Sequence, residues 1–497
     1  MLHLLALLGP ISLLLPALLP PLAPAEDAAR QRRLATAASL VALGAALLLA
    51  LGLMLGGRVD GPWLQLDAMT GLLLPLVAAI GAVVVSYSRR YLDGDGGQGR
   101  FFRWLGFTLA CVLLLVVSGN LVLFGLCWMG ASLGLHRLML FYPGRAAAQL
   151  AARKKALASR IGDGCMLGAA LLAWHVFDRL DFAGIAALAP AMEQGWATHA
   201  LAALLVLAAL VKSAQFPLHG WLTEVMETPT PVSALLHAGI INAGGILLLR
   251  MSGALALSGP AMDGLLLVGA VTAVFGAAVM LTQSSVKVNL AWSTIAQMGF
   301  MMMQCGLGAF GAALLHIVAH ALYKAHAFLS SGGVVATRRP DPLEPLPLPR
   351  LLAALAASLA LVLLTGWAFG HGLGDKTGAV LLGAVLMMGL APMLAACRGR
   401  WMTLRAGGLA VAACIAWFAL QGAASALLGP VVLPERGWLA PLISLLALGG
   451  FAALLVLNAR RRSAAPGPRL RALHHHLRQG LYVNALLNRL LAPKGAL

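Results

Sequence analysis

The stretch ALLHIVAHALYKAHAFL (residues 313–329) is apolar enough to cross a membrane, yet its only formally charged residue is Lys324. His316 and His320 precede this lysine at spacings of four residues, so on a helix the two imidazoles and the ammonium group share one face. A charged side chain at the centre of a bilayer costs roughly 2.5–3.5 kcal/mol on insertion scales and is kept where it faces protein or water and performs a function. The stretch therefore predicts a membrane helix that carries a relay of titratable groups.

Lys212 repeats this pattern, because the uncharged stretch ALAALLVLAALV (200–211) leads directly into it. The chain continues as KSAQFPLHGWLTEVMETPTPVSALLHAG (212–239), where three prolines each remove a backbone donor. Interrupted helices at membrane depth are tolerated where they are buried in protein or line a wet cavity, and they recur in transporters built from inverted repeats. We therefore expect a broken helix after Lys212 and two related half-channels, one around each lysine.

The composition excludes an ordinary soluble globular protein, because 60% of the 497 residues are hydrophobic and only 10% are charged. We predict an all-α polytopic membrane protein with about 13–15 transmembrane helices, arranged as inverted repeats of five helices with broken helices. The apolar runs are residues 1–24, 34–57, 67–88, 102–118, 120–142, 160–177, 199–216, 231–251, 262–283, 287–306, 308–332, 350–372, 377–396, 405–426 and 437–459.

The loops between these runs are short, so the chain is expected to contain no separate soluble domain. The predicted parts are N-terminal transmembrane helices (1–101), a first five-helix repeat (102–251), a second, inverted repeat (252–396), C-terminal transmembrane helices (397–459) and a basic amphipathic tail (460–497). The tail is predicted either to lie on anionic lipid headgroups or to dock a cytoplasmic partner. The run His474–His476 within it is interpreted as solvated rather than metal-binding.

The net charge of +18 could indicate a nucleic-acid partner, but most of the 35 Lys and Arg lie in alternate loops and in the tail. This asymmetry follows the positive-inside rule. It predicts a multi-pass protein of the bacterial inner membrane with its N-terminus outside and its C-terminus cytoplasmic, and no nucleic-acid partner. The first run lacks the basic start and cleavage site of a secretory signal, so it is expected to be retained.

The six cysteines all lie inside predicted helices and form no CxxC pair. His316 and His320 are separated as HIVAH, without the glutamate of a zinc-binding HExxH motif or an evident third ligand. We therefore expect this chain to hold no metal and no cofactor.

Four strings resemble, in the same order, the antiporter-like subunits of complex I (chain L) and of multisubunit Mrp cation/proton antiporters. They are SRIGD (159–163), the string 212–239, VKVNLAWSTIAQMGFM (286–301) and HALYKAHAFLSSGG (320–333). The resemblance covers roughly residues 87–340 and implies a hydrated, charged axis across the membrane. The residues that it implies for ion translocation are Lys212, His237, Lys287, His316, His320 and Lys324.

The chain departs from the family pattern at two places. In GLCWMGASLGLHRL (125–138), Met129 stands where related subunits carry a glutamate that pairs with the lysine matching Lys212. In LTGWAFGHGLGDK (364–376), the lysine-containing break of the twelfth helix has no match, which predicts that one side of the pathway is rebuilt or closed. The possible counter-charges for Lys212 are Asp163, Glu224 and Glu227, and the possible auxiliary residues are His136, Arg137, His326 and His371.

The missing glutamate, the string YKAHAFLSSGG (323–333) and the tail string GLYVNALLNRLL (480–491) resemble the membrane B subunits of DAB inorganic carbon accumulation systems. That resemblance implies a large, soluble, cytoplasmic A subunit (DabA-like) related to zinc carbonic anhydrases, which would hold the zinc and perform the catalysis. This chain would then carry no catalytic residue and would conduct protons or sodium ions. The alternatives are a subunit of a multisubunit sodium/proton antiporter or of a hydrogenase- or complex I-like pump, and a non-conducting membrane scaffold.

Overall fold

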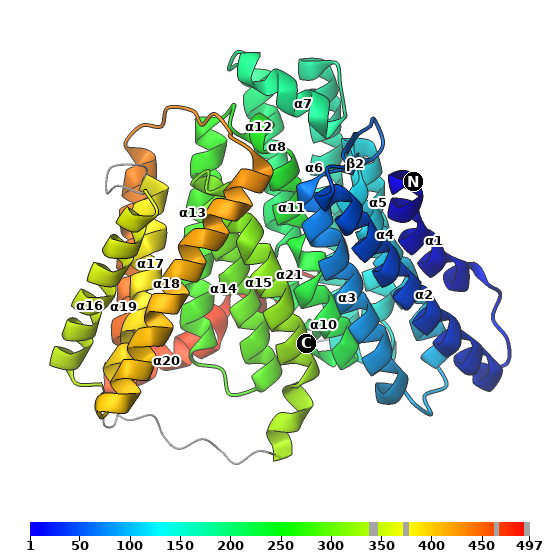
Figure 1. Cartoon of the computed structure of the whole chain (residues 1–497). Helices are drawn as coiled ribbons and strands as arrows, with labels where there is room; N and C mark the ends of the chain where they lie inside the picture. Colours follow the sequence, from blue (N-terminus) through cyan, green and yellow to red (C-terminus); the bar gives the residue numbers. More distant parts are fainter. Residues whose placement is uncertain (337–345, 371–376, 462–466, 492–497) are drawn as a thin grey trace.

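The computed structural model describes residues 1–336, 346–370, 377–461 and 467–491, and in these ranges the chain is almost entirely helical (Figure 1). A hairpin of β1 (Val59–Asp60) and β2 (Gln65–Leu66) pairs Val59 with Leu66. The first half of the chain forms α1 (Leu2–Leu18), α2 (Pro24–Met54), α3 (Ala68–Tyr91), α4 (Gln98–Val117), α5 (Leu121–Met139), α6 (Ala146–Phe177), α7 (Phe182–Leu188), α8 (Trp196–Lys212), α9 (Gly220–Thr223), α10 (Thr230–Ala238) and α11 (Ala243–Arg250).

The second half forms α12 (Ser252–Leu255), α13 (Gly259–Met280), α14 (Val286–Gly306), α15 (Phe310–Leu329), α16 (Leu348–Ala368), α17 (Thr377–Ala396), α18 (Arg400–Leu428), α19 (Leu439–Arg461), α20 (Pro468–Arg478) and α21 (Val483–Leu491). The short 3-10 turns are η1 (Ala189–Ala191), η2 (Val225–Glu227), η3 (Ile240–Asn242), η4 (Ser331–Ala336) and η5 (Gly480–Tyr482). Within the described ranges, twelve helices are long and apolar enough to cross a membrane.

The predicted fold class, a polytopic helical membrane protein with broken helices, is confirmed. The predicted count of about 13–15 spans exceeds these twelve, which do not include the predicted spans at α1, α8 and α14; α1 and α8 have 17 residues each, at the lower limit for a membrane crossing. Several predicted boundaries were also wrong, most clearly for α6, which begins at Ala146 rather than at residue 160. Its third turn carries Arg153, Lys154 and Lys155, and such a cluster of charges is typical of a loop between membrane helices.

The predicted break after Lys212 is present. Helix α8 ends at Lys212, and Ala214 adopts a positive φ of 50°. The backbone then passes through short turns to α10, whose second residue is Pro231. Helix α10 stops at Ala238, where the Asn242 side-chain amide donates to the Ala238 carbonyl at 2.9 Å. Side-chain bonds of this kind satisfy carbonyl groups that the interrupted helix leaves without a partner.

Helices α13 and α14 lie in backbone contact, and this contact holds α14 in place beside the break. A Cβ atom on Gly269 would lie 2.5 Å from the Met303 backbone nitrogen, and one on Gly299 would lie 2.5 Å from the Ala273 nitrogen. Small residues permit such close approach between membrane helices. In Figure 1, α14 and α15 lie in the middle of the molecule, with α16–α19 on one side and α1–α5 on the other.

The outer end of the break is tied to α3 by an ion pair. The Arg250 guanidinium, at the end of α11, donates to the Asp67 carboxylate, and its Nη2 is 2.8 Å from Thr70 Oγ1. Burial alone would raise the pKa of Asp67, but the charge of Arg250 and the hydrogen bonds from Arg250 and Thr70 hold that pKa below its usual value. The pair therefore stabilises the fold when Asp67 is ionised.

The C-terminal tail packs on protein. The Leu477 side chain is buried, and the Gln283 amide donates to the Arg478 carbonyl at 3.2 Å. Asn484 and Asn488 of α21 donate to Glu224 Oε1 at 2.7 and 3.1 Å. These contacts hold α20 against the turn between α13 and α14, and α21 against the interrupted segment between α8 and α10. Neither interpretation of the tail had included them.

Candidate functional site: two buried lysine sites

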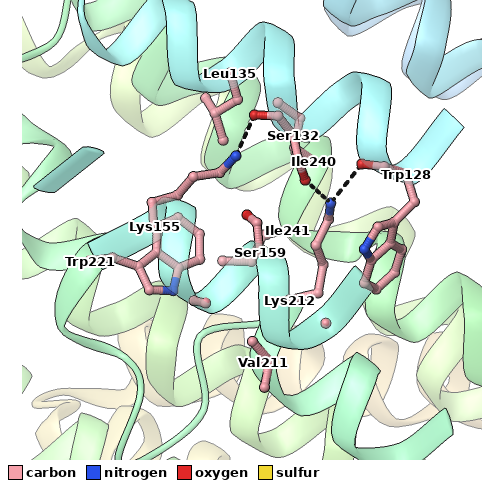
Figure 2. A pocket seen from close by; sticks show the side chains of 12 residues that line it. Trp128, Ser132, Leu135, Lys155, Ser159, Val211, Lys212, Trp221, Ile240 and Ile241 are labelled. Carbon is pink, nitrogen blue, oxygen red and sulfur yellow. Dashed lines mark hydrogen bonds between the residues drawn. The ribbon is translucent and has the colours of Figure 1, made fainter. Parts of the chain in front are cut away.

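Lys212 is the last residue of α8 and reaches across to α5. Its Nζ donates to Ser132 Oγ at 2.7 Å and to the Trp128 carbonyl at 3.3 Å, as Figure 2 shows. The ammonium group also lies 4.2 Å from the centroid of the Trp128 ring, which is a cation–π distance. The α8 break thus places a cation against neutral oxygens and an aromatic face.

A second lysine, which the sequence analysis did not identify, shares this site. Lys155 of α6 is 5% exposed, and its Nζ donates to the Ser132 carbonyl. Lys155 lay in the run AARKKALASR (151–160), which was taken for a cytoplasmic loop. The signal that could have found it is helical spacing, since Lys155, Ser159 and Gly162 share one face of α6.

The carboxylates proposed as counter-charges for Lys212 have other partners. Asp163 Oδ2 lies 2.9 Å from Arg160 Nη2, and Glu224 Oε1 lies 2.7 Å from Lys154 Nζ. The side chain of Glu227 lies outside the described residues. Among the described residues, Lys212 makes no ion pair with any carboxylate.

Lys324 occupies an equivalent site in the second half. Its side chain is fully buried, and its Nζ donates to Ser293 Oγ at 2.7 Å and to the Leu290 carbonyl at 3.2 Å, both on α14. The ligands are thus again one hydroxyl and one backbone carbonyl of a neighbouring helix. This correspondence agrees with the predicted relation between the two lysines.

His237 of α10 is linked to Lys324 through α14. Its Nδ1 is 2.9 Å from Thr294 Oγ1, and that hydroxyl donates to the Leu290 carbonyl at 3.0 Å. The carbonyl of Leu290 therefore accepts from both Thr294 and Lys324. The structure brings these two predicted residues together, although they come from helices far apart in the sequence.

His316 and His320 lie on the same helix as Lys324, about two turns and one turn before it, respectively. Their ring centroids are 5.9 Å apart, and the two rings lie at an interplanar angle of 36°. His320 is 4% exposed, and neither of its ring nitrogens has a hydrogen-bond partner among the described residues. An unbonded buried imidazole beside a lysine can accept or donate a proton if water enters.

Lys287 stands at the start of α14, at the other end of this cluster. Its Nζ donates to Thr230 Oγ1 at 2.9 Å, and the Thr230 hydroxyl donates to the Tyr91 hydroxyl at 3.3 Å. Thr230 begins α10, so His237 lies about two turns further along the same helix. Lys287 therefore contacts the N-terminal end of α10, whereas His237 lies near its C-terminal end.

The auxiliary residues His326 and Arg137 join neither cluster, whereas His136 lies close enough to Lys155 for their charges to interact. His326 is exposed, and Arg137 lies on the exposed face of α5 with its guanidinium 5.5 Å from the Trp104 ring centroid. His136 is half-buried and its Nδ1 has no partner among the described residues. His371 lies outside the described residues.

The region between the two lysine sites is mainly apolar. A cavity of about 20 Å³ extends from Lys212 and Asn242 to Ile317 and Ala321 of α15, the helix that carries Lys324, although Lys324 does not line it. This is room for about one water molecule. Proton exchange between the halves would therefore need water in this apolar cavity.

The described residues contain no group of three or more His, Cys, Asp or Glu side chains placed to hold a metal ion. The expectation that this chain carries no metal or cofactor remains a prediction.

Comparison with known proteins identifies the class to which these two sites belong. Residues 118–366, half of the chain, match the family described as "NADH:quinone oxidoreductase/Mrp antiporter, TM", and residues 63–102 match "NADH-Ubiquinone oxidoreductase (complex I), chain 5 N-terminus". The chain belongs to this family of antiporter-like membrane subunits. A solved structure of the Mrp complex from Dietzia sp. superposes on 99% of the chain and 57% of the matched chain, with a TM-score of 0.57 and 27% identity.

Within the family, the chain is similar to proteins named as inorganic carbon transporter subunits. It is 51% identical over 272 residues to "Probable inorganic carbon transporter subunit DabB2" of Halothiobacillus neapolitanus, covering 54% of this chain and 49% of that one. It is 45% identical over 284 residues to "Probable inorganic carbon transporter subunit DabB" of Hydrogenovibrio crunogenus, covering 56% and 54%. The chain thus spans about half the length of these relatives. The family expected from the four sequence strings is confirmed.

Proposed function

We propose that the chain is the ion-translocating membrane subunit of an energy-coupled inorganic carbon pump. Inward flow of protons or sodium ions along the Lys212–Lys324 axis would make CO2 hydration one-way in a soluble, zinc carbonic-anhydrase-like partner (DabA-like). The observation that carries the proposal is a pair of lysines inside the helical bundle, Lys324 buried and Lys212 partly buried, each bonded to one serine hydroxyl and one backbone carbonyl. The similarity to carbon transporter subunits supports the choice of substrate.

The available driving force suits this task. One charge that crosses 100 mV releases about 2.3 kcal/mol, so roughly 150 mV supplies about 3.5 kcal/mol per ion. That free energy biases an equilibrium by about 300-fold. A single coupled ion would therefore suffice to raise bicarbonate well above its equilibrium level.

The residue types favour the proton as the coupling ion. Lys324, His320 and His237 present nitrogen atoms, which exchange protons. Hard metal cations prefer several oxygen ligands. In this proposal the two lysines store the proton, and His316 and His320 pass it along α15.

The orientation follows from charge. The basic tail, with its exposed Arg469 and Arg471 on α20, is proposed to face the cytoplasm, and the N-terminus to face outside. The soluble partner would then dock on the side of the membrane where α20 and α21 lie.

The test is co-expression of the chain with a large soluble reading frame adjacent to it, in cells that lack carbonic anhydrase. We expect growth in air that is abolished by an uncoupler and by Lys324→Ala. His326→Ala, an exposed histidine on the same helix, is the matched control and should leave growth unchanged. Growth that survives both the uncoupler and Lys324→Ala, but not deletion of residues 468–497, would instead establish a scaffold.

A second candidate function is cation/proton antiport, favoured by the superposition on the Mrp complex over nearly the whole chain. Antiport predicts that the chain restores growth of sodium-sensitive cells together with small membrane subunits. It predicts no effect on growth in air.

A further inference from the structure

The cavity beside Lys212 is lined by hydrogen-bond donors. The ammonium groups of Lys155 and Lys212 converge on Ser132, one on its carbonyl and the other on its hydroxyl (Figure 2). Two indoles, from Trp128 and Trp221, line the same cavity. Each indole nitrogen is buried and has no hydrogen-bond partner among the described residues. An indole N–H can only donate, so each lacks an acceptor.

The charges around this cavity do not balance. None of its twelve lining residues is acidic. Asp163 lies on α6 two turns after Lys155, but it already pairs with Arg160. This one carboxylate also acts on the charges of Lys155 and Lys212, so three cations share it, and Met129 adds no charge from α5.

Two physical costs follow from this arrangement. Like charges bonded to the same residue repel each other more strongly in a low-dielectric interior than in water. Buried N–H groups without an acceptor keep their full desolvation penalty. A water molecule would accept from an indole, but it would leave the two positive charges uncompensated. An anion would accept hydrogen bonds from the indole N–H groups and would also offset the positive charges, so it would reduce both costs.

We propose that this cavity binds a small inorganic monoanion of chloride size, held by Lys155, Lys212 and the indole N–H groups of Trp128 and Trp221. The cavity volume of about 20 Å³ sets the size, because it is room for about one water molecule. Bicarbonate, with four heavy atoms, fits only if the cavity widens. The bound anion supplies Lys212 with an exchangeable counter-charge in addition to Asp163, which Lys212 shares with Lys155 and Arg160.

This site goes beyond the proposed ion pathway, since a proton or sodium path does not itself require an anion. Its binding can be measured without any ion flux. Failure of the anion site would therefore leave the carbon-pump proposal intact, and failure of the pump would leave the anion site intact.

The experiment is binding of radioactive chloride to the purified full chain, with its partner, in lipid nanodiscs. We expect saturable binding at one site per chain. Lys155→Met should weaken it by about 10- to 100-fold, the effect of losing a charged hydrogen bond. Trp221→Phe, which removes one neutral donor and retains the aromatic ring, should weaken it by about 3- to 10-fold.

Arg153→Met is the matched control, because Arg153 is an exposed cation two residues before Lys155. It should bind chloride as the wild type does. Absence of saturable binding to the wild type, or equal affinity in the wild type and Lys155→Met, would overturn the proposal. Because Lys155→Met could disturb folding, its thermal unfolding is measured alongside, and Trp221→Phe provides the second variant.

Two further results define the ligand. An anomalous difference map of bromide-soaked protein should show its peak between the two lysines, and a map with bromide only on the protein surface would contradict the site. Displacement of chloride by bicarbonate would show that the carbon substrate shares the cavity. Its failure to displace chloride would restrict the site to halide-sized anions.

Discussion

The Lys212 and Lys324 sites hold their lysines in the same way but surround them differently. Each Nζ lies 2.7 Å from a serine hydroxyl and 3.2–3.3 Å from a backbone carbonyl. Lys212 ends a broken helix and shares its cavity with Lys155, whereas Lys324 lies inside a continuous helix together with His320. The two sites therefore share the way in which the lysine is anchored and differ in the titratable groups around it.

The largest expected effect is that of Lys324→Ala. It removes the cation that lies on the same helix as His316 and His320 and leaves Ser293 without its donor. We expect carbon-dependent growth and proton uptake into vesicles to fall at least about 100-fold. Ser293→Ala, which keeps the lysine, should lose much less. If both variants behaved alike, the lysine would act only through that hydrogen bond.

Lys212→Met tests whether the two sites are equivalent. If both lysines store the transported charge, this variant should be as inactive as Lys324→Ala, measured as proton uptake into vesicles. Activity that persists in Lys212→Met but disappears in the double variant with Lys155→Met would show that Lys155 replaces Lys212. The two halves would then differ in mechanism as well as in surroundings.

The histidines distinguish the second site from the first. His320→Gln should lower proton uptake by roughly 100-fold, the usual contribution of a positioned acid–base group. His326→Gln, on the exposed face of the same helix, should have no effect. An equal loss in both variants would mean that α15 is sensitive to substitution in general, and the relay would be rejected.

The contact between the tail and the break can be tested at Asn484. Asn484→Ala removes one donor to Glu224, whose Oε1 also accepts from Lys154 and Asn488. We expect about 1–2 kcal/mol lower stability of the tail contact, seen as faster proteolysis after residue 461. If Asn484→Ala is cleaved at the same rate as the wild type, the apolar contacts of α21 hold the tail instead.

The smallest effect is expected at the outer end of the break. Asp67 loses its charge when the pH falls through its lowered folded pKa, so the stabilisation by Arg250 is present at neutral pH and disappears only in acid, below about 3.8. Asp67→Asn should therefore lower the thermal stability at pH 7 and abolish this part of the acid dependence. If the thermal stability of Asp67→Asn depended on acid pH as that of the wild type does, the Asp67–Arg250 pair would not be the cause of this dependence.

Much of the architecture could be predicted because a bilayer imposes simple rules. Apolar runs must match its thickness, and the prolines in 212–239 cannot continue a helix. Lys324 and Lys212 were evident because each is an isolated charge next to a long uncharged stretch. The same rule failed at Lys154 and Lys155, where adjacent basic residues suggested a loop although both are buried.

The sequence by itself determined the membrane helices, the break after Lys212 and the two lysines, since burial cost and proline geometry are local properties of the chain. Only the tertiary structure decided their partners: Ser132 and Lys155 for Lys212, Ser293 for Lys324, and Lys154 for Glu224. These contacts join residues on separate helices, and their formation depends on how the helices pack. The local sequence pattern does not determine this packing. The charged partners around each lysine therefore follow only from the three-dimensional structure.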